Sequence, residues 1–204
     1  MTGRTIITEL DLREVSQPQR HAQVYATFST LAVGQSFTLV NDHDPVHLRE
    51  QMDADLHGSF AWEYLRGEPR DWRITISRLA STPLPRVVVD SREAGRSGEP
   101  DVVGATWRLT PSERELDANI IALPPGGAIE EHVGADLDVL LHVVDGTGTL
   151  RTEGEDVLLR AGAVVYLPRR ARRAVLAGSH GLRYLSVHRR KETLPLMPRV
   201  APPA

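Results

Sequence analysis

The chain has 204 residues, of which 41% are hydrophobic and 25% charged, a composition typical of folded proteins and of neither disordered nor membrane-embedded ones. A formal charge of −3 argues against nucleic-acid binding, which relies on clustered Lys and Arg, although the run Arg169–Arg173 is a local exception. The absence of cysteine excludes disulfides, thiolate ligands and sulfur nucleophiles, so a metal would have to be held by His, Asp or Glu. No run approaches the roughly 18 apolar residues of a membrane span, and acidic residues come too early for a signal peptide. We therefore expect a cytoplasmic protein without membrane contact.

The first eighty residues alternate between strand-like and helix-like patterns. Strands are predicted where apolar residues alternate, and helices where they recur every three or four residues. The expected order is strand, helix, strand, helix, strand, strand, over residues 5–12, 16–31, 35–41, 44–56, 59–65 and 71–79. This pattern predicts an α+β fold for residues 1–80, a βαβαββ domain of two layers.

Turn residues mark the ends of both predicted helices. Ser16 is placed to cap the first helix, with Pro18 in its first turn, and Gly34 follows its last turn. Asp44 before Pro45 is expected to cap the second helix in the same way.

The composition changes after the first domain. Residues 81–103 are rich in proline, glycine and charge and are predicted to be a linker. From residue 104 to 192, short apolar runs separated by turns predict an all-β sandwich or jelly-roll barrel. The Pro-rich end, residues 193–204, is expected to be a loose tail or an arm on a partner subunit.

Residues 104–190 resemble the cupin superfamily, whose motifs read G-x5-H-x-H-x3/4-E-x6-G and G-x5-P-x-G-x2-H-x3-N. The framework of both motifs is present at Gly126, His132, Gly146, Gly162 and Pro168. The resemblance implies a β-barrel with a cavity and places His132 in that cavity. It also implies a homodimer formed through this domain.

The chain departs from the cupin motifs at the metal ligands. The second histidine is Gly134, the acidic ligand is at best Asp138, and Arg170 and Arg173 replace the second-motif glycine and histidine. A guanidinium about 5 Å from a dication would be repelled by roughly 6–7 kcal/mol at an effective dielectric near 20. If Arg173 points inward, the usual metal is therefore disfavoured.

Two interpretations of this degenerate site stay open. In the first, the cavity binds a small anionic ligand through His132, Asp138, Arg170 and Arg173. In the second, iron, manganese, nickel or zinc is held by His132 and Asp138 with His142 as a third candidate, and the protein is a dioxygenase or isomerase. Strand alternation places Asp138 and His142 on one face, so both enter the cavity or both leave it.

The first half resembles an uncharacterised bacterial domain related to the TusA sulfur-carrier fold. The resemblance rests on "DLR" at 11–13, "RH" at 20–21, "LVNDHDP" at 39–45 and "FAWEYL" at 60–65. TusA-type carriers work through a cysteine that this chain lacks, so persulfide transfer is excluded and the resemblance implies only a fold. His21, Asp42 and His43 are expected to meet at one edge of the sheet as a candidate metal or anion site.

The sequence thus supports three functions in order of preference. The first is a cupin-fold protein that binds or senses a small molecule. The second is a metal-dependent cupin enzyme. The third is an accessory protein in redox or nitrogen-oxide metabolism that acts by binding a partner, which relatives of the N-terminal domain suggest.

Overall fold

The computed structural model describes residues 5–94 and 103–191. The chain forms two compact units, which are residues 1–87 with 110–113 (the N-terminal unit) and residues 88–109 with 114–204 (the C-terminal unit). The tail expected over residues 193–204 and residues 95–102 of the expected linker lie outside the described residues.

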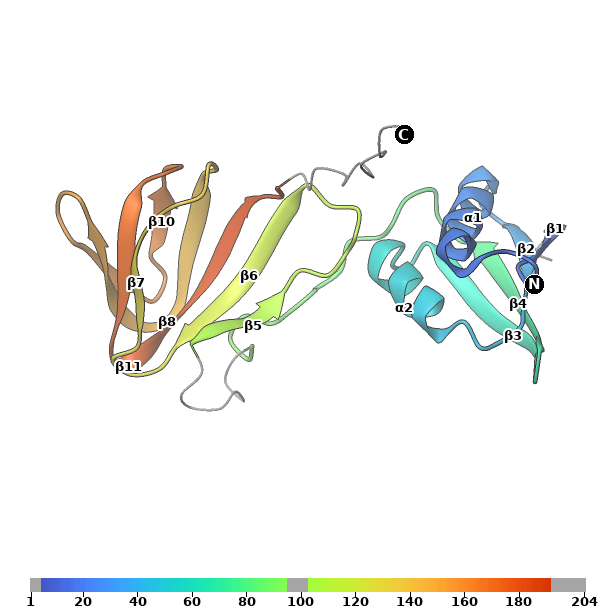
Figure 1. Cartoon of the computed structure of the whole chain (residues 1–204), viewed down its shortest axis with the longest axis horizontal. Coiled ribbons are helices and arrows are strands. Elements are labelled where there is room, and N and C mark those ends of the chain that lie inside the picture. Colours follow the sequence, from blue (N-terminus) through green and yellow to red (C-terminus); the bar gives the residue numbers. More distant parts are fainter. Residues whose placement is uncertain (1–4, 95–102, 192–204) are drawn as a thin grey trace, which may run out of the picture. The chain divides into compact units, whose positions relative to one another are not determined.

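The N-terminal unit has the expected βαβαββ order (Figure 1). Its elements are β1 (Thr5–Asp11), α1 (Gln17–Thr30), β2 (Gln35–Asn41), α2 (Val46–Asp55), β3 (Phe60–Glu68) and β4 (Asp71–Arg78). The strands form one sheet in the order β1-β2-β4-β3, in which β1 and β2 are parallel and the other pairs are antiparallel. The parallel pair requires a crossover, and α1 supplies it.

One hydrophobic core joins the helices to the sheet of this unit. Apolar residues that recur every four positions are buried in both helices, at Val24 and Phe28 of α1 and at Leu48 and Met52 of α2. The sheet contributes four side chains with no exposed surface, Phe37, Leu39, Ile74 and Ile76. Full burial of such a side chain is worth about 1.5–3 kcal/mol, so this layer holds the two helices against the sheet.

The helix starts differ in detail from the expected caps. Ser16 is the N-cap residue of α1, but its hydroxyl contacts the Gln19 side chain at 2.9 Å and makes no capping bond. The prediction that Asp44 caps α2 is wrong, because the N-cap residue is Pro45 and no side chain caps the helix. The Asp44 carboxylate instead accepts a hydrogen bond of 2.9 Å from the Tyr64 hydroxyl.

The described part of the C-terminal unit is built from strands, as expected. They are β5 (Gly104–Arg108), β6 (Leu116–Leu123), β7 (Ala128–Val133), β8 (Val139–Thr152), β9 (Val157–Arg160), β10 (Val164–Leu167) and β11 (Arg172–Arg189). Five of them follow the order β10-β8-β11-β6-β5, while β7 pairs with β11 and β9 with β8. The long strands β8 and β11 pair with each other along most of their length, so they hold the other strands together.

Three register shifts in β11 affect which of its side chains face the interior. β11 pairs with β7 at Arg173↔His132 and at Val175↔Ile129, with an irregularity between the two pairs. Its pairing with β8 shifts between Ala177 and Leu182 and again between Arg183 and Tyr184. A β-bulge changes which residues of a strand share a face.

The interior of the C-terminal unit is lined by alternate residues of β8 and β11. Val139, Leu141 and Val143 from β8 are buried, as are Leu182 and Tyr184 from β11.

Among the described residues, no helix has the length and apolar character needed to cross a membrane.

Candidate functional site

A cavity of about 410 Å³ opens into the C-terminal unit. Its apolar walls come from β7, β8, β10 and β11. The residues that line it are Asp117, Ile129, His132, Ala135, Leu137, Val139, Leu141, Leu167, Arg173, Val175, Tyr184, Ser186, His188 and Lys191. A volume of this size lies in the range of small-molecule sites, and a few polar groups among apolar walls are typical of them.

Arg173 is one of the charged groups that line this cavity. Its Nη1 atom is buried and has no hydrogen-bond partner in the described part of the chain. Burial lowers the pKa of Arg173 from its ordinary value, because the surroundings solvate the cation less well than water does. A guanidinium stays protonated in proteins, so the cavity contains a positive charge whose buried hydrogen-bond donor is not satisfied.

His132 lies beside Arg173, because the two residues are register partners on β7 and β11. Its Nδ1 contacts the Glu130 carbonyl oxygen at 2.9 Å, which assigns the hydrogen to Nδ1. His132 and Ile129 both line the cavity although three positions separate them, which strict alternation forbids. The irregularity in the β7–β11 pairing accounts for this.

Gly134 leaves the space that Arg173 occupies. A Cβ atom built on Gly134 would overlap the guanidinium of Arg173. Gly134 is also tied to the segment that leads into β11, since its N–H donates to the Ala171 carbonyl at 3.0 Å. The departures from the cupin motifs at Gly134 and Arg173 are therefore spatially linked, because the arginine side chain occupies the space that a side chain at position 134 would need.

The sequence reasoning missed the cavity residues contributed by the second half of β11. Tyr184, Ser186 and His188 line the cavity, and their alternation in the run "LRYLSVH" was the available signal. Burial raises the pKa of Tyr184 to about 12, so its hydroxyl keeps its proton at neutral pH and can donate a hydrogen bond.

Asp117, the carboxylate of the cavity, is paired with Arg114. The Arg114 guanidinium donates to Asp117 at 2.6 Å and 2.9 Å. Lys191 adds a further cation to the lining. The charge left for a ligand is therefore positive.

Asp138 and His142 do not line the cavity. The three residues Asp138, Leu140 and His142 are exposed, while Val139 and Leu141 between them face inward. The Asp138 carboxylate accepts the Arg169 backbone N–H at 2.9 Å and a hydrogen bond from Tyr166. Of the two outcomes that alternation allowed, both polar groups leave the cavity.

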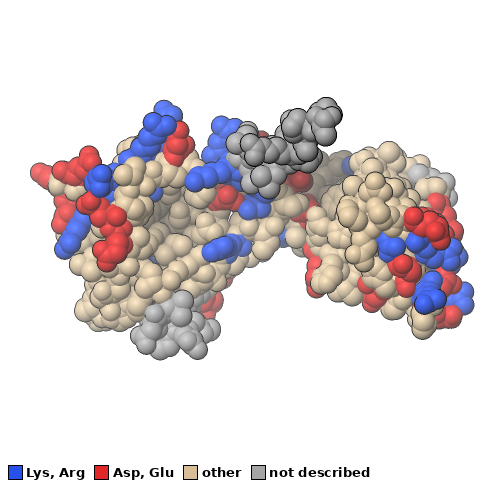
Figure 2. Space-filling view, in the orientation of Figure 1, with Lys and Arg blue, Asp and Glu red and all other residues tan. Residues whose placement is uncertain are grey.

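Arg170 and Arg172 belong to the surface. Arg170 donates to the Asp136 carboxylate at 2.6 Å, and Arg172 contacts Glu131 at 3.0 Å and Glu153 at 3.4 Å. Figure 2 shows acidic and basic side chains intermixed over the end of the C-terminal unit that carries β7. Arg170 and Arg172 are thus paired at the surface, whereas Arg173 turns inward.

The residues present do not fit a metal. No group of three His, Asp or Glu side chains in the described ranges could hold an ion. His132 shares the cavity with the Arg173 guanidinium, whereas Asp138 and His142 point elsewhere. A catalytic metal needs about three fixed ligands and an open position.

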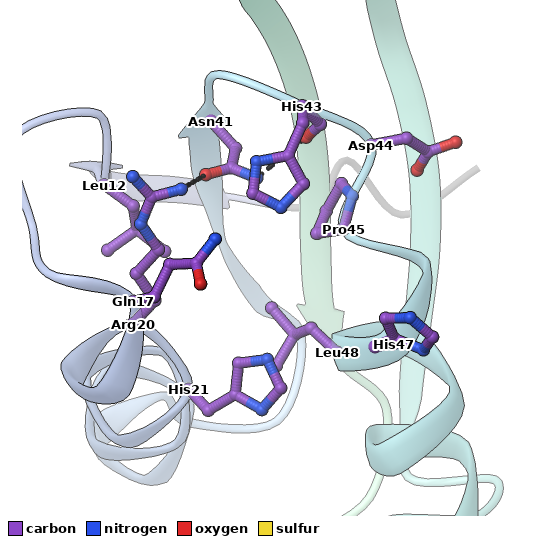
Figure 3. A pocket seen from close by; sticks show the side chains of 10 residues that line it. All are labelled: Leu12, Gln17, Arg20, His21, Asn41, His43, Asp44, Pro45, His47 and Leu48. Atoms are coloured by element: carbon purple, nitrogen blue, oxygen red, sulfur yellow. Dashed lines mark hydrogen bonds between the residues drawn. The ribbon is translucent and has the colours of Figure 1, made fainter.

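The second candidate site lies in the N-terminal unit, around a pocket of about 270 Å³ (Figure 3). His21 and His43 line it, and so does His47, which the sequence reasoning missed. Asp42 is paired instead, since its carboxylate accepts from Arg20 at 2.7 Å and 3.1 Å and contacts His43 Nδ1 at 2.6 Å. The Arg20 guanidinium, with help from His43, holds the pKa of Asp42 far below its usual range.

Each half of the chain is matched in part by a protein-family model of its own. Residues 119–188 match the family model described as "Cupin domain". The C-terminal half of this chain contains a cupin domain. Residues 9–78 match a second model, described as "Uncharacterized conserved protein (DUF2249)". No comparison bears on the expected likeness to the TusA fold, which stays a prediction.

Solved structures similar to this chain align with about half of it. They include the protein TT1209 from Thermus thermophilus (23% identity, 50% of this chain and 95% of that chain, TM-score 0.44). A Cupin 2 conserved barrel domain protein from Salinispora arenicola is 24% identical over 40% of this chain and 71% of its own, with a TM-score of 0.37. KdgF from Halomonas sp. is 18% identical over 42% and 78%, with a TM-score of 0.38. A search of curated proteins found no match.

The cupin domain keeps the backbone geometry that its motif glycines provide. Gly126, Gly146 and Gly162 all have positive φ angles, between 69° and 88°. A Cβ atom on Gly146 would also overlap the Gly181 carbonyl oxygen, so both space and conformation require glycine there. Arg170, at the position of the second-motif glycine, retains the left-handed conformation with φ of 61°.

Proposed function

We propose that the cupin domain binds a small anionic molecule, a carboxylate or a phosphate, with Arg173 as the charged anchor. The observation that carries this proposal is Arg173 itself, a residue that lines a cavity of about 410 Å³ and whose buried Nη1 atom lacks a hydrogen-bond partner in the described residues. An unsatisfied buried donor costs about 1–3 kcal/mol, and an anion that accepts from it removes this cost.

The other polar groups of the cavity support an anion. Tyr184 donates from its protonated hydroxyl, and His132 presents its Nε2 atom, which accepts from a protonated ligand or donates when the ring is charged. Asp117 does not oppose an anion, because Arg114 neutralises it. Asp138 and Arg170 contribute no contact here, so His132 and Arg173 carry the assignment among the residues expected from the sequence.

The test is titration calorimetry of the full chain with a panel of small carboxylates and inorganic phosphate. A charge-assisted hydrogen bond is worth about 1.5–3 kcal/mol, so Arg173→Met should weaken binding roughly ten- to hundredfold. Arg172→Met is the matched control, because its guanidinium is on the surface and paired with Glu131 and Glu153. Equal affinity of both variants and the unmodified protein would reject Arg173 as the anchor.

A metal-dependent cupin enzyme is the second candidate, with iron, manganese, nickel or zinc as the cofactor. It would need His132 to coordinate an ion while the guanidinium of Arg173 turns away, and neither Asp138 nor His142 lines the cavity to supply a further ligand. Elemental analysis of protein made without a histidine tag separates the candidates. A full equivalent of metal that His132→Ala removes would favour the enzyme over the anion-binding protein.

We also propose that the cupin domain forms a homodimer through the outer face of β8 and β10. Leu140, Val164 and Tyr166 are 51%, 65% and 59% exposed, and the register Tyr166↔Leu140 makes them neighbours. An exposed apolar patch beside an edge strand is typical of a protein contact surface. Analytical ultracentrifugation should give a dimer that Tyr166→Glu dissociates and that Leu158→Glu, at a comparably exposed residue of β9, leaves intact. A monomeric unmodified protein would refute this.

Action through a redox partner stays a further alternative, which co-purification from the native host would test.

A further inference from the structure

The pocket in the N-terminal unit has imidazole rings on its walls that no other function of the protein uses. His21 comes from the second turn of α1, His43 from the loop after β2 and His47 from the first turn of α2. Figure 3 shows the rings of His21 and His43 pointing into the pocket from different elements. Leu12 and Leu48 provide apolar walls.

The hydrogen bonds around His43 determine which nitrogen faces the pocket as an acceptor. His43 Nδ1 lies 2.6 Å from the Asp42 carboxylate. Arg20 keeps Asp42 ionised, and an ionised carboxylate only accepts hydrogen bonds, so the hydrogen of the neutral ring is on Nδ1. The Nε2 atom of His43 then carries a lone pair.

A second network fixes His21 in the same tautomer. His21 Nδ1 lies 2.8 Å from Gln51 Oε1. The Gln51 amide group donates to the Asp55 carboxylate, which orients its oxygen toward the histidine. Asp55 is itself held by the Tyr25 hydroxyl at 2.9 Å and the Ser112 hydroxyl at 2.6 Å. The Nε2 atom of His21 therefore also carries a lone pair.

The fixed charges of the pocket cancel one another, so they do not oppose a cationic ligand. The positive charge of Arg20 is cancelled by Asp42, and its guanidinium is occupied by Asp42, Asn41 and the Val15 carbonyl. Asp44 lines the pocket and adds a negative charge close to the start of α2, where it offsets the partial positive charge of the helix end.

We propose that this pocket binds a small ligand that donates hydrogen bonds from a cationic nitrogen group, such as an amidine or an amine, to the Nε2 atoms of His21 and His43. The pocket volume of about 270 Å³ equals that of about nine water molecules, which is enough for a single-ring compound. The site lies in the unit that does not contain the cupin domain, so it is independent of the anion proposed there.

The first experiment determines the tautomers in the full chain. Long-range ¹H–¹⁵N spectra of the ¹⁵N-labelled protein at pH 7.5 should place the hydrogen of His21 and His43 on Nδ1, whereas free histidine prefers Nε2. His57, which is exposed and lies outside the pocket, provides the internal reference. A hydrogen on Nε2 of both His21 and His43 would overturn the proposal.

The second experiment compares benzamidine with benzoate, which has nearly the same shape and the opposite charge. Benzamidine should shift the ring signals of His21 and His43, and benzoate should not, although benzoate is free to shift His132 in the cupin domain. His21→Ala and His43→Ala should each weaken benzamidine binding about tenfold, while His57→Ala leaves it unchanged. Two results would contradict the proposal. One is that benzoate shifts the signals of these two rings more than benzamidine does. The other is that benzamidine causes no shift at about 10 mM, a concentration at which even millimolar binding would be detected.

Discussion

Replacing Arg173 by methionine should make the ligand-free protein more stable. Met keeps the apolar stem but removes a buried cation whose Nη1 has no hydrogen-bond partner among the described residues. An unsatisfied buried donor costs about 1–3 kcal/mol, and the partial exposure of this side chain reduces the gain to about 1–2 kcal/mol. For a unit of this size, each kcal/mol raises Tm by about 4–8 °C.

The measurement is urea unfolding and calorimetry of exhaustively dialysed protein. Arg172→Met, which loses exposed ion pairs, should change the free energy of unfolding by no more than about 1 kcal/mol in the unfavourable direction. An anion at a hundredfold excess over its Kd should stabilise the unmodified protein by about 2.7 kcal/mol and the Arg173→Met variant much less, which reverses their order. If Arg173→Met destabilises the ligand-free protein by more than about 1 kcal/mol, the guanidinium makes favourable contacts and our reasoning is wrong.

Three further predictions address the metal, the backbone and the response to pH. Gly134→His combined with Arg173→His should bind about one equivalent of nickel or zinc by elemental analysis, whereas Gly134→His alone should not, because the remaining guanidinium repels the ion by roughly 6–7 kcal/mol at about 5 Å. Gly146→Ala should lower the free energy of unfolding by more than about 2 kcal/mol, and Gly162→Ala by about 1 kcal/mol. Both glycines have positive φ, but only a Cβ at position 146 would also overlap the backbone. Equal losses of the two variants in urea unfolding would contradict this. Asp42 has a lowered pKa in the folded state, so its contribution to stability is present above about pH 4 and disappears as the pH falls. Asp42→Asn should therefore be less stable than the unmodified protein at pH 6, and a gap that does not narrow toward pH 3 would count against the ion pair.

Much of the fold could be predicted because it depends on local patterns. The stripe at Val24 and Phe28 and the alternation at Ile74 and Ile76 identify elements that are buried as expected. The cap of α2 could not be predicted in this way. Asp44 has the right chemistry and nearly the right position, but a hydroxyl twenty residues away, on Tyr64, takes its carboxylate.

The direction of Arg173 could not be decided from the sequence. Alternation sends Arg172 and Arg173 to opposite faces without saying which one is inside. The answer depends on the pairing of β11 with β7, where an irregularity brings Ile129 and His132 to the same side. Irregularities of this kind have no fixed sequence signal, whereas the absence of a side chain at Gly134 could have indicated the space that the arginine fills.

The same limit explains the pocket of the N-terminal unit. His21 and His43 could be assigned to one edge of the sheet because helix starts and loop residues gather there. The ion pair of Asp42 with Arg20 could not be predicted in this way, because it depends on how α1 packs beside the end of β2. His47 was overlooked because a histidine at the exposed start of a helix carries no pattern of its own.

The position of β11 in the chain has a consequence for biosynthesis. This strand supplies partners for β6, β7 and β8, yet it is the last strand to leave the ribosome among those described. The edges of β6, β7 and β8 that pair with β11 stay unpaired until about residue 189 has left the ribosome. The strands of the N-terminal sheet, by contrast, are complete at Arg78. A nascent chain stalled before β11 should therefore recruit chaperones through its second half.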